Sequence, residues 1–514
     1  MHRNVSSVLG SALVLASLAA GGSVLAQDAR DTLRVAMYSK APSRGNVYGV
    51  PNTWPSMFWW EAIYDSFVRV DDKTQLRPHA AESWELVNNT TWRVKFKPNV
   101  EFSNGRKNDA ANVVAIFDYL HSEQGKSASI IRNVKLASYK ALDANTVEFV
   151  TQEPDPLLVA KFAGFYTADM KAWAEMGLEA FTARPVTSGP FKVVSWNDNE
   201  MVAAAHDKSW RAPKAKNLRM TEVPEPPARV AALESGQSDI IINMGPDDIA
   251  RIRGAGHQAI IDPAPYVVSL ALFTEDFANK WNKGGKTPFA DRRVRQAVNY
   301  AIDRNALVKD LFGGITEPSG QPAAPQTFGY NPDVKPYPHD PAKARALLAE
   351  AGYPNGFSIL METQTGAIPQ GREVLQAIAN DLGKVGVKTD VRSLPFAEWV
   401  GKLIGKKWEG ESTSFSMFHS PMIDVSVPFV WYSCQAPQRF TCVEELEPLI
   451  SAQAKEMDRS KRQAILRDLM KKSNEEALSI TVMDGKDITG VAKRVRGFGL
   501  WHRVVLYENI SVDG

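Results

Sequence analysis

Apolar and polar residues alternate in several short segments of the chain, which predicts half-buried β-strands. The alternation is clearest at residues 33–37, 92–97, 146–150 and 191–196. Successive side chains of a strand point to opposite faces, so one face of each segment should be buried. A Gly-Pro turn interrupts the pattern just before the fourth segment.

Other segments place apolar residues three or four positions apart, which is typical of a helix with one buried face. Asp109 can cap such a helix, whose apolar face is formed by Val113, Ile116, Phe117 and Leu120. Further helices are predicted at residues 230–233, 294–301, 341–352 and 373–382, and further strands at 239–242, 266–273 and 387–391. Because helices and strands alternate in the second half, we expect an α/β fold.

The first 26 residues have the pattern of a secretory signal peptide. Arg3 supplies the positive start, residues 8–20 form an apolar run, and Ala26 is the small residue at which cleavage is expected. The run is shorter than the ~20 residues that span a bilayer, which argues against a membrane anchor. No cysteine follows it, so we expect no lipid anchor and a periplasmic location.

Size and charge narrow the class of protein. The chain has 514 residues, far more than the ~100–150 of a typical domain, so at least two lobes are expected. Lys and Arg number 60 against 58 Asp and Glu. Such a balanced chain has no strong positive field, so nucleic acid is not an expected partner.

Two cysteines, Cys434 and Cys442, are close in the sequence. In a compartment that permits oxidation, we expect them to form a disulfide that closes a short loop. A redox pair is the alternative, but the C-x-x-C spacing of such pairs is absent.

The motifs of common enzymes are missing. Residues 284–287 imitate the end of a phosphate-binding loop, but Lys280 stands where its first glycine is required. The G-x-S-x-G pattern is absent, and the 8 histidines are scattered without an H-x-x-x-H pair. We therefore expect no enzyme, no cofactor and no metal site; a secreted hydrolase is the enzyme class weighed against this view.

A cluster of arginines at Arg292, Arg293 and Arg295 resembles a phosphate-binding patch at first sight. Basic residues on a helix are usually solvated or paired. We expect pairing with neighbours such as Asp291 and Asp303.

Eight stretches follow one another in a recognisable order over nearly the whole mature chain. They are residues 76–84, 100–105, 187–191, 231–240, 288–304, 340–353, 382–387 and 459–470. Together they resemble the family 5 extracellular solute-binding proteins, the peptide, nickel and oligosaccharide receptors of ABC importers.

The resemblance implies a fold of the periplasmic binding protein type II kind, with two jaws joined by crossing strands and an accessory lobe. Lobe I would comprise residues 27–72, 185–270 and 485–514, lobe II residues 73–184, and lobe III residues 271–484. Crossing strands are expected near residues 267–273 and 480–489. A ligand would lie between the jaws, which close by a hinge motion.

The resemblance also implies a function. The protein would be the periplasmic component of an ABC importer that captures di- or oligopeptides and delivers them to the membrane permease, acting as a monomer. An opine, an oligosaccharide, a metal chelate or haem is the alternative ligand, and the 13 tryptophans favour the sugar among these. A chemosensory or chaperone-like periplasmic receptor is the alternative of another class.

One aspartate is singled out by the resemblance. Peptide receptors of the family carry an aspartate followed four residues later by proline, as Asp424 and Pro428 do here. In those relatives the aspartate binds the α-ammonium of the ligand. A loop cap is the alternative role. The local pattern departs from the family, because Phe418 and His419 stand where a tryptophan is common, and this weakens the peptide assignment.

Other candidate contacts come from the start of the chain. Relatives place ligand contacts in the segment after the first strand, which contains Trp54 and Met57. The next two aromatic residues, Trp59 and Trp60, are better read as core. Tyr38 ends the first strand and points either to the ligand or to the core. We also count Phe418 and His419 among the candidate contacts.

Overall fold

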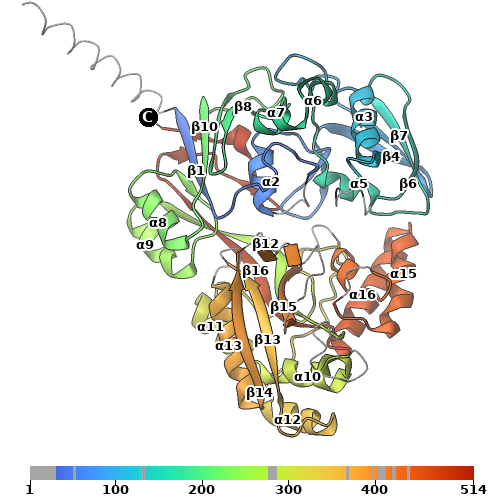
Figure 1. Ribbon diagram of the computed structural model, residues 1–514, viewed down its shortest axis with the longest axis vertical. Coiled ribbons are helices and arrows are strands. Elements are labelled where there is room, and N and C mark those ends of the chain that lie inside the picture. Colours follow the sequence, from blue (N-terminus) through green and yellow to red (C-terminus); the bar gives the residue numbers. More distant parts are fainter. Residues whose placement is uncertain are drawn as a thin grey trace, which may run out of the picture.

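A computed structural model describes residues 31–513 except 50–53, 127, 129–130, 132–133, 276–285, 366–369, 396–397, 400, 403–411, 420–423 and 437–439. The predicted signal peptide lies outside the described residues. The largest sheet runs through the whole molecule (Figure 1). In spatial order its strands are β14 (Val387–Leu394), β13 (Phe357–Gln364), β15 (Ser412–His419), β12 (Gln258–Leu272), β16 (Ser479–Val491), β11 (Ile240–Ile241), β1 (Thr32–Met37), β10 (Asn217–Glu222), β9 (Glu200–Ala205) and β8 (Phe191–Trp196).

The upper part of the molecule in Figure 1 is built on β1, which pairs in parallel with both β10 and β11. Its helices are α2 (Trp54–Glu61), α8 (Pro226–Glu234) and α9 (Ile249–Gly254). Trp59 and Trp60 on α2 are fully buried, as expected of core residues. They contribute to a hydrophobic core that also contains Leu33 and Val35 of β1.

An accessory sheet adjoins the upper part. It consists of β4 (Ala81–Asn88), β5 (Thr91–Phe96), β7 (Thr146–Thr151) and β6 (Leu136–Ala141). Helix α3 (Ala110–His121) packs on it with the four predicted apolar residues buried, and the carboxylate of Asp109 accepts a bond from Asn112 N as its cap. The accessory sheet and the upper part share one hydrophobic core.

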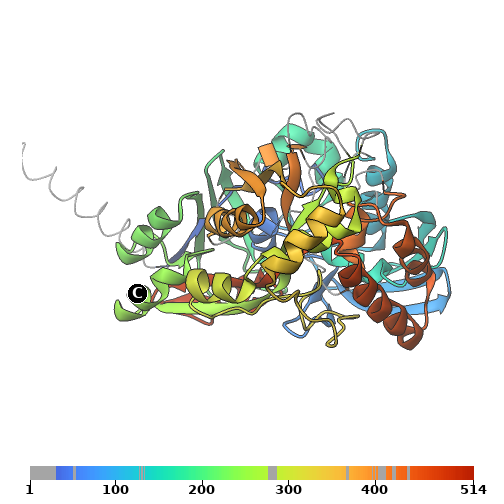
Figure 2. The same cartoon turned by 90° about the horizontal axis from the view of Figure 1, so that it is seen from below.

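The lower part contains the parallel pair β13 and β14 and most of the later helices. These helices are α10 (Arg292–Ala301), α11 (Arg304–Phe312), α12 (Pro341–Glu350), α13 (Gly371–Lys384), α15 (Glu447–Lys455) and α16 (Arg459–Glu475). Seen from below, α15 and α16 lie on the side opposite to the C-terminus (Figure 2). This part has its own hydrophobic cores, separate from that of the upper part.

Shorter elements complete the described chain. They are β2 (Val68–Val70), β3 (Leu76–Pro78), α5 (Leu158–Lys161), α6 (Met170–Met176), α7 (Leu178–Ala183), β17 (Val495–Arg496), β18 (Leu500–Trp501), β19 (Val504–Val505), β20 (Ser511–Val512) and the 3-10 helices Phe162–Gly164, Pro246–Asp248, Pro288–Ala290, Val427–Trp431, Glu444–Leu446 and Tyr507–Asn509. None of the helices in the described residues is long and apolar enough to cross a membrane.

The α/β fold with two parts joined by crossing strands is confirmed. The predicted strand at 266–273 is the second half of the longer β12, whereas the one at 239–242 shortens to β11. The predicted lobe boundaries stay a prediction. The upper core draws on buried residues up to 259 and from 488, and the largest lower core on residues 266–387 and 480–483.

The arginine cluster is paired, as expected, but with a partner that the sequence did not suggest. Arg293 binds Asp291, whereas Arg292 and Arg295 both bind Glu476. The prediction that Asp303 pairs with this cluster is wrong, because its carboxylate caps α11 and lies near a histidine instead.

The crossing strands β12 and β16 pair antiparallel, and their register shifts twice, between Pro263 and Val267 and between Val268 and Ser269. Pro263 lies opposite Lys486 and Val267 opposite Asp484, so three residues of β12 face the single residue Gly485. Such a bulge bends a strand locally. Glycine is required there, because a Cβ on Gly485 would lie 2.5 Å from ring atoms of the buried Tyr266.

We therefore expect Gly485→Ala to lower the free energy of unfolding by ~1–3 kcal/mol, the usual cost of overpacking. Gly383→Ala is a matched control, because a Cβ at that position in α13 meets no atom within 4 Å. Because Gly383 lies in the last turn of α13, alanine there should be neutral or should stabilise by at most ~0.5–1 kcal/mol. Urea unfolding of both variants checks this, and equal stabilities would contradict the packing at the crossing.

Candidate functional site

Two residues in a strained turn lie at the crossing of the two long strands. His502 and Arg503 join β18 to β19, and both have positive φ, 48° and 68°. A two-residue hairpin turn of this kind normally uses Asn or Gly. Holding larger residues there costs ~1–3 kcal/mol each, and such strain tends to occur at functional positions.

The strained turn brings Arg503 onto both crossing strands. Its Nη2 donates to Asp487 Oδ1 of β16 at 3.0 Å, and its Nε pairs with the other carboxylate oxygen. Its guanidinium carbon lies 4.8 Å from the centre of the Tyr266 ring of β12. Arg503 is 3 % exposed and Asp487 4 %. One buried cation thus connects the C-terminal segment to both strands.

Tyr38 stands next to this group, directly after β1. Its hydroxyl is influenced by the charges of Arg503, Asp487 and Arg229, and burial raises its pKa, so it stays protonated. Ligands of open α/β sheets bind beyond the carboxyl ends of parallel strands, and Tyr38 occupies that position on β1. It is 6 % exposed in this conformation.

A second carboxylate of the crossing, Asp262, lies directly opposite Asp487 in the β12–β16 register. Two like charges side by side disfavour ionisation. Burial, and then the charge of Asp487, raises the pKa of Asp262 to about 6. The crossing therefore contains a carboxyl group that titrates in mildly acidic solution.

The lower part contributes the carboxyl end of β13. Glu362 is 1 % exposed and accepts a 2.6 Å bond from Lys402 Nζ. Gln364, at the end of the strand, is buried, and its Oε1 has no hydrogen-bond partner among the described residues. Gln370, just before α13, donates to Asp247 of the upper part at 3.0 Å. This end of β13 therefore lies toward the upper part.

Four predicted contacts remain, Trp54, Met57, Phe418 and His419, and only Met57 has a described side chain. Met57 on α2 is 7 % exposed, whereas the side chains of Trp54, Phe418 and His419 lie outside the described residues. The backbones of Phe418 and His419 end β15, where His419 pairs with Val267, the first residue after the bulge.

Asp424 lies deeper in the lower part and has partners within the protein. Arg462 of α16 donates to both of its carboxylate oxygens, at 2.5 and 3.0 Å. Its Oδ1 also accepts bonds from the backbone N and the hydroxyl of Ser426, as a loop cap does. The residue is 2 % exposed. The amine-anchor role stays a prediction, in which a ligand ammonium would share this carboxylate with Arg462.

Cys434 and Cys442 are joined by a disulfide. The loop that they close lies against the end of β12, because Thr441 donates to Leu272 O and Cys442 N donates to the Thr274 hydroxyl. Within the described part of the chain, His, Cys, Asp and Glu side chains form no group that could hold a metal ion.

Sequence reasoning missed Arg503, Asp487 and the Glu362–Lys402 pair. The local sequence does not indicate their pairing, because the partners are 16 or 40 positions apart. One signal was available for Asp487. It is a charged residue inside the crossing strand predicted at 480–489, which was otherwise expected to be buried.

Comparison with known proteins gives a consistent result. The sequence profile of the bacterial extracellular solute-binding proteins, family 5, matches residues 75–428. Haem-binding protein A of Haemophilus influenzae is 28% identical over 406 residues, covering 71% of this chain and 72% of its own length. The dipeptide-binding protein of Escherichia coli strain K12 is 26% identical over 486 residues, covering 86% and 87%.

Solved structures show the same fold. The periplasmic binding protein AgaA from A. tumefacien R10, in complex with agropinic acid, superimposes with a TM-score of 0.81 at 22% identity, covering 94% of this chain and 99% of its own. DppA from Helicobacter pylori, in complex with the peptide STSA, gives a TM-score of 0.77 at 18% identity, covering 95% and 100%.

The raised pKa of Asp262 predicts a pH dependence of stability. The folded protein holds this proton up to about pH 6, whereas the unfolded chain releases it near 3.8. Between these values the folded state binds more protons, so the free energy of unfolding should fall as the pH rises. Asp262→Asn should reduce this fall by ~1–2 kcal/mol between pH 4 and 6.5.

Thermal unfolding across this pH range measures the effect. Asp198→Asn, in an exposed turn, is the control and should keep the wild-type profile. An Asp262→Asn profile parallel to that of the wild type would contradict the raised pKa of Asp262.

The internal pairing of Asp424 predicts a stability effect. Asp424→Asn would leave the buried guanidinium of Arg462 without its carboxylate, which should cost ~3–5 kcal/mol of unfolding free energy. The same substitution at Asp390, whose pair with Arg392 is exposed, should change stability by less than ~1 kcal/mol. Denaturant unfolding of both variants compares them, and equal effects would refute the buried pair.

Proposed function

Because the chain belongs to the bacterial extracellular solute-binding proteins, family 5, we propose that it binds a small solute between its two parts and delivers it to the permease of an ABC importer. The observation that carries the proposal is the crossing of β12 and β16, where a bulge separates the two cores. The protein would work in the periplasm as a monomer, after cleavage near Ala26. It would need no cofactor and catalyse no reaction.

Three polar contacts support a closing motion about this crossing. Thr74 Oγ1 donates to Gln326 O at 2.6 Å, and Gln370 binds Asp247 as described above. Lys455 of α15 pairs with Glu153, beyond β7 of the accessory sheet, at 3.0 Å. An exposed ion pair such as that of Lys455 contributes only ~0–1 kcal/mol. Closure would therefore depend on the bound solute.

We propose peptides as the solute class. Curated relatives include the dipeptide-binding protein and a glutathione-binding protein from Pectobacterium atrosepticum, which is 25% identical over 456 residues. The ligand would meet Tyr38, Trp54 and Met57 from the upper part and Phe418 and His419 from the end of β15. Asp424 would act as the amine anchor only if it gives up part of its bonding to Arg462.

Haem is the second candidate, because haem-binding protein A is a relative of similar identity. An opine, a metal chelate and an oligosaccharide remain alternative ligands of the same transport role. A chemosensory receptor would bind the same ligand but signal rather than transport, so deletion of the permease would distinguish the two roles.

Mass spectrometry of the small molecule that co-purifies with the protein tests the ligand class. We expect an intact peptide, recovered without cleavage. Adding it back at 100 times its Kd should stabilise the ligand-free protein by ~2.7 kcal/mol, and the radius of gyration should fall on binding. Recovery of haem or an opine would replace the peptide assignment, and cleavage of the peptide would contradict the absence of catalysis.

Two variants separate the modes of recognition. If Asp424 anchors an amine, Asp424→Asn should weaken peptide binding by ~2–5 kcal/mol, and an N-acetylated peptide should bind the wild type poorly. If the ligand is a neutral sugar, Trp54→Ala should have the larger effect because stacking would dominate. Calorimetry on folded variants decides, and unchanged peptide binding by Asp424→Asn would eliminate the amine anchor.

A further inference from the structure

Arg304, the first residue of α11, is a buried cation without a carboxylate partner. It is 4 % exposed, and no carboxylate oxygen of the described residues lies within ion-pair distance of its guanidinium. Burial lowers its pKa to about 10, so it is still protonated at neutral pH. A buried charge without an opposite charge is costly, which points to a missing counterion.

The hydrogen bonds of Arg304 leave donors unused. Nε donates to Thr481 O at 2.6 Å, Nη1 to Asn299 O at 2.9 Å and Nη2 to Asn299 Oδ1 at 2.6 Å. An arginine has five N–H groups, so two have no partner among the described residues. By contrast, the buried Arg295 and Arg462 have the carboxylates of Glu476 and Asp424.

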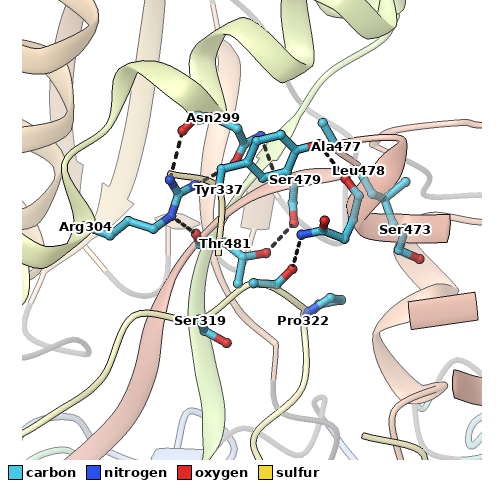
Figure 3. A pocket seen from close by; sticks show the side chains of 12 residues that line it. Asn299, Arg304, Ser319, Pro322, Tyr337, Ser473, Ala477, Leu478, Ser479 and Thr481 are labelled. Atoms are coloured by element: carbon cyan, nitrogen blue, oxygen red, sulfur yellow. Dashed lines mark hydrogen bonds between the residues drawn. The ribbon is translucent and has the colours of Figure 1, made fainter. Parts of the chain in front are cut away.

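A small polar cavity adjoins Arg304 (Figure 3). The cavity volume is ≈ 10 Å³, about the space that one water-sized particle needs. The hydroxyls of Ser479 and Thr481 line it and lie 3.3 Å from each other. Tyr337 and Asn474 line both this cavity and a groove of ≈ 540 Å³, so the groove is its neighbour.

We propose that this cavity binds one small monovalent inorganic anion, with chloride as the test case. The free N–H groups of Arg304 and a hydroxyl of the Ser479–Thr481 pair would be its donors. The space excludes a larger anion such as sulfate. Because Arg304 and Asn299 also bind the carbonyls of Thr481 and Ser479, the anion would hold the lower end of β16 in place.

Bromide, which has a strong anomalous signal, identifies the occupant directly. Crystals of the mature protein grown in sodium bromide should show an anomalous peak in contact with the Arg304 guanidinium. A water without anomalous signal at that position would overturn the proposal. This outcome is independent of the transported ligand, so it leaves the proposed function untouched.

Solution measurements test the same site. At constant ionic strength, replacing gluconate by chloride should lower the unfolding constant about 11-fold when chloride reaches ten times its Kd, and sulfate should lack this effect. Thr481→Val removes a lining hydroxyl but keeps the carbonyl bonded to Arg304, so the chloride effect should shrink. Ser473→Ala is the control, because that hydroxyl already donates to Leu469 O.

Arg304→Met should abolish the chloride effect if the variant folds. If it does not fold, the comparison of Thr481→Val with Ser473→Ala decides. Equal chloride dependence in the wild type and Thr481→Val, or equal stabilities in gluconate and chloride, would overturn the proposal.

Discussion

The pairing of β12 with β16 is the constraint on which the rest of the structure depends. Their ladder begins with Gln258 opposite Val491 and ends with Ala271 opposite Ser479, so it belongs to the cores of both parts. The bulge beside Gly485 interrupts it between those cores. A strand pair is stiff along its length, so bending should concentrate where ladder bonds are missing. This arrangement allows each part to move as a rigid body while the backbone stays continuous.

Buried ion pairs fix side chains at this crossing and deeper in the lower part. Arg503 pairs with Asp487 and Arg462 with Asp424, and in each pair both residues are less than a twentieth exposed. Burying such charges adds little net stability, but removing one partner is costly. The pairs therefore act as geometric restraints. Arg503 restrains the C-terminal turn against both strands, and Arg462 restrains the loop that follows β15 against α16.

The local sequence was sufficient to predict elements and caps but not the charge pairs. Alternation located β1, β5, β7 and β8, and Asp109 was recognised as a cap because the helical apolar face begins just after it. Both signals act over a few residues. By contrast, Asp424 and Arg462 are 38 positions apart, and only the packing of α16 brings them together. The position of Arg503 depends on positive φ at two residues that rarely adopt it, which no sequence pattern indicated.

The fold does not decide which solute is bound, because relatives named for haem and dipeptides share this family. The side chains around the ligand must decide, and two buried or half-buried ion pairs lie near the crossing and on β13, Arg503 with Asp487 and Glu362 with Lys402. A ligand with a net charge would attract one member of such a pair and leave the other member without its opposite charge. Redistributing buried charges in this way costs several kcal/mol. Under the proposed function, a zwitterion such as a peptide with free termini would offer an opposite charge to both members, whereas an anion or a cation would not.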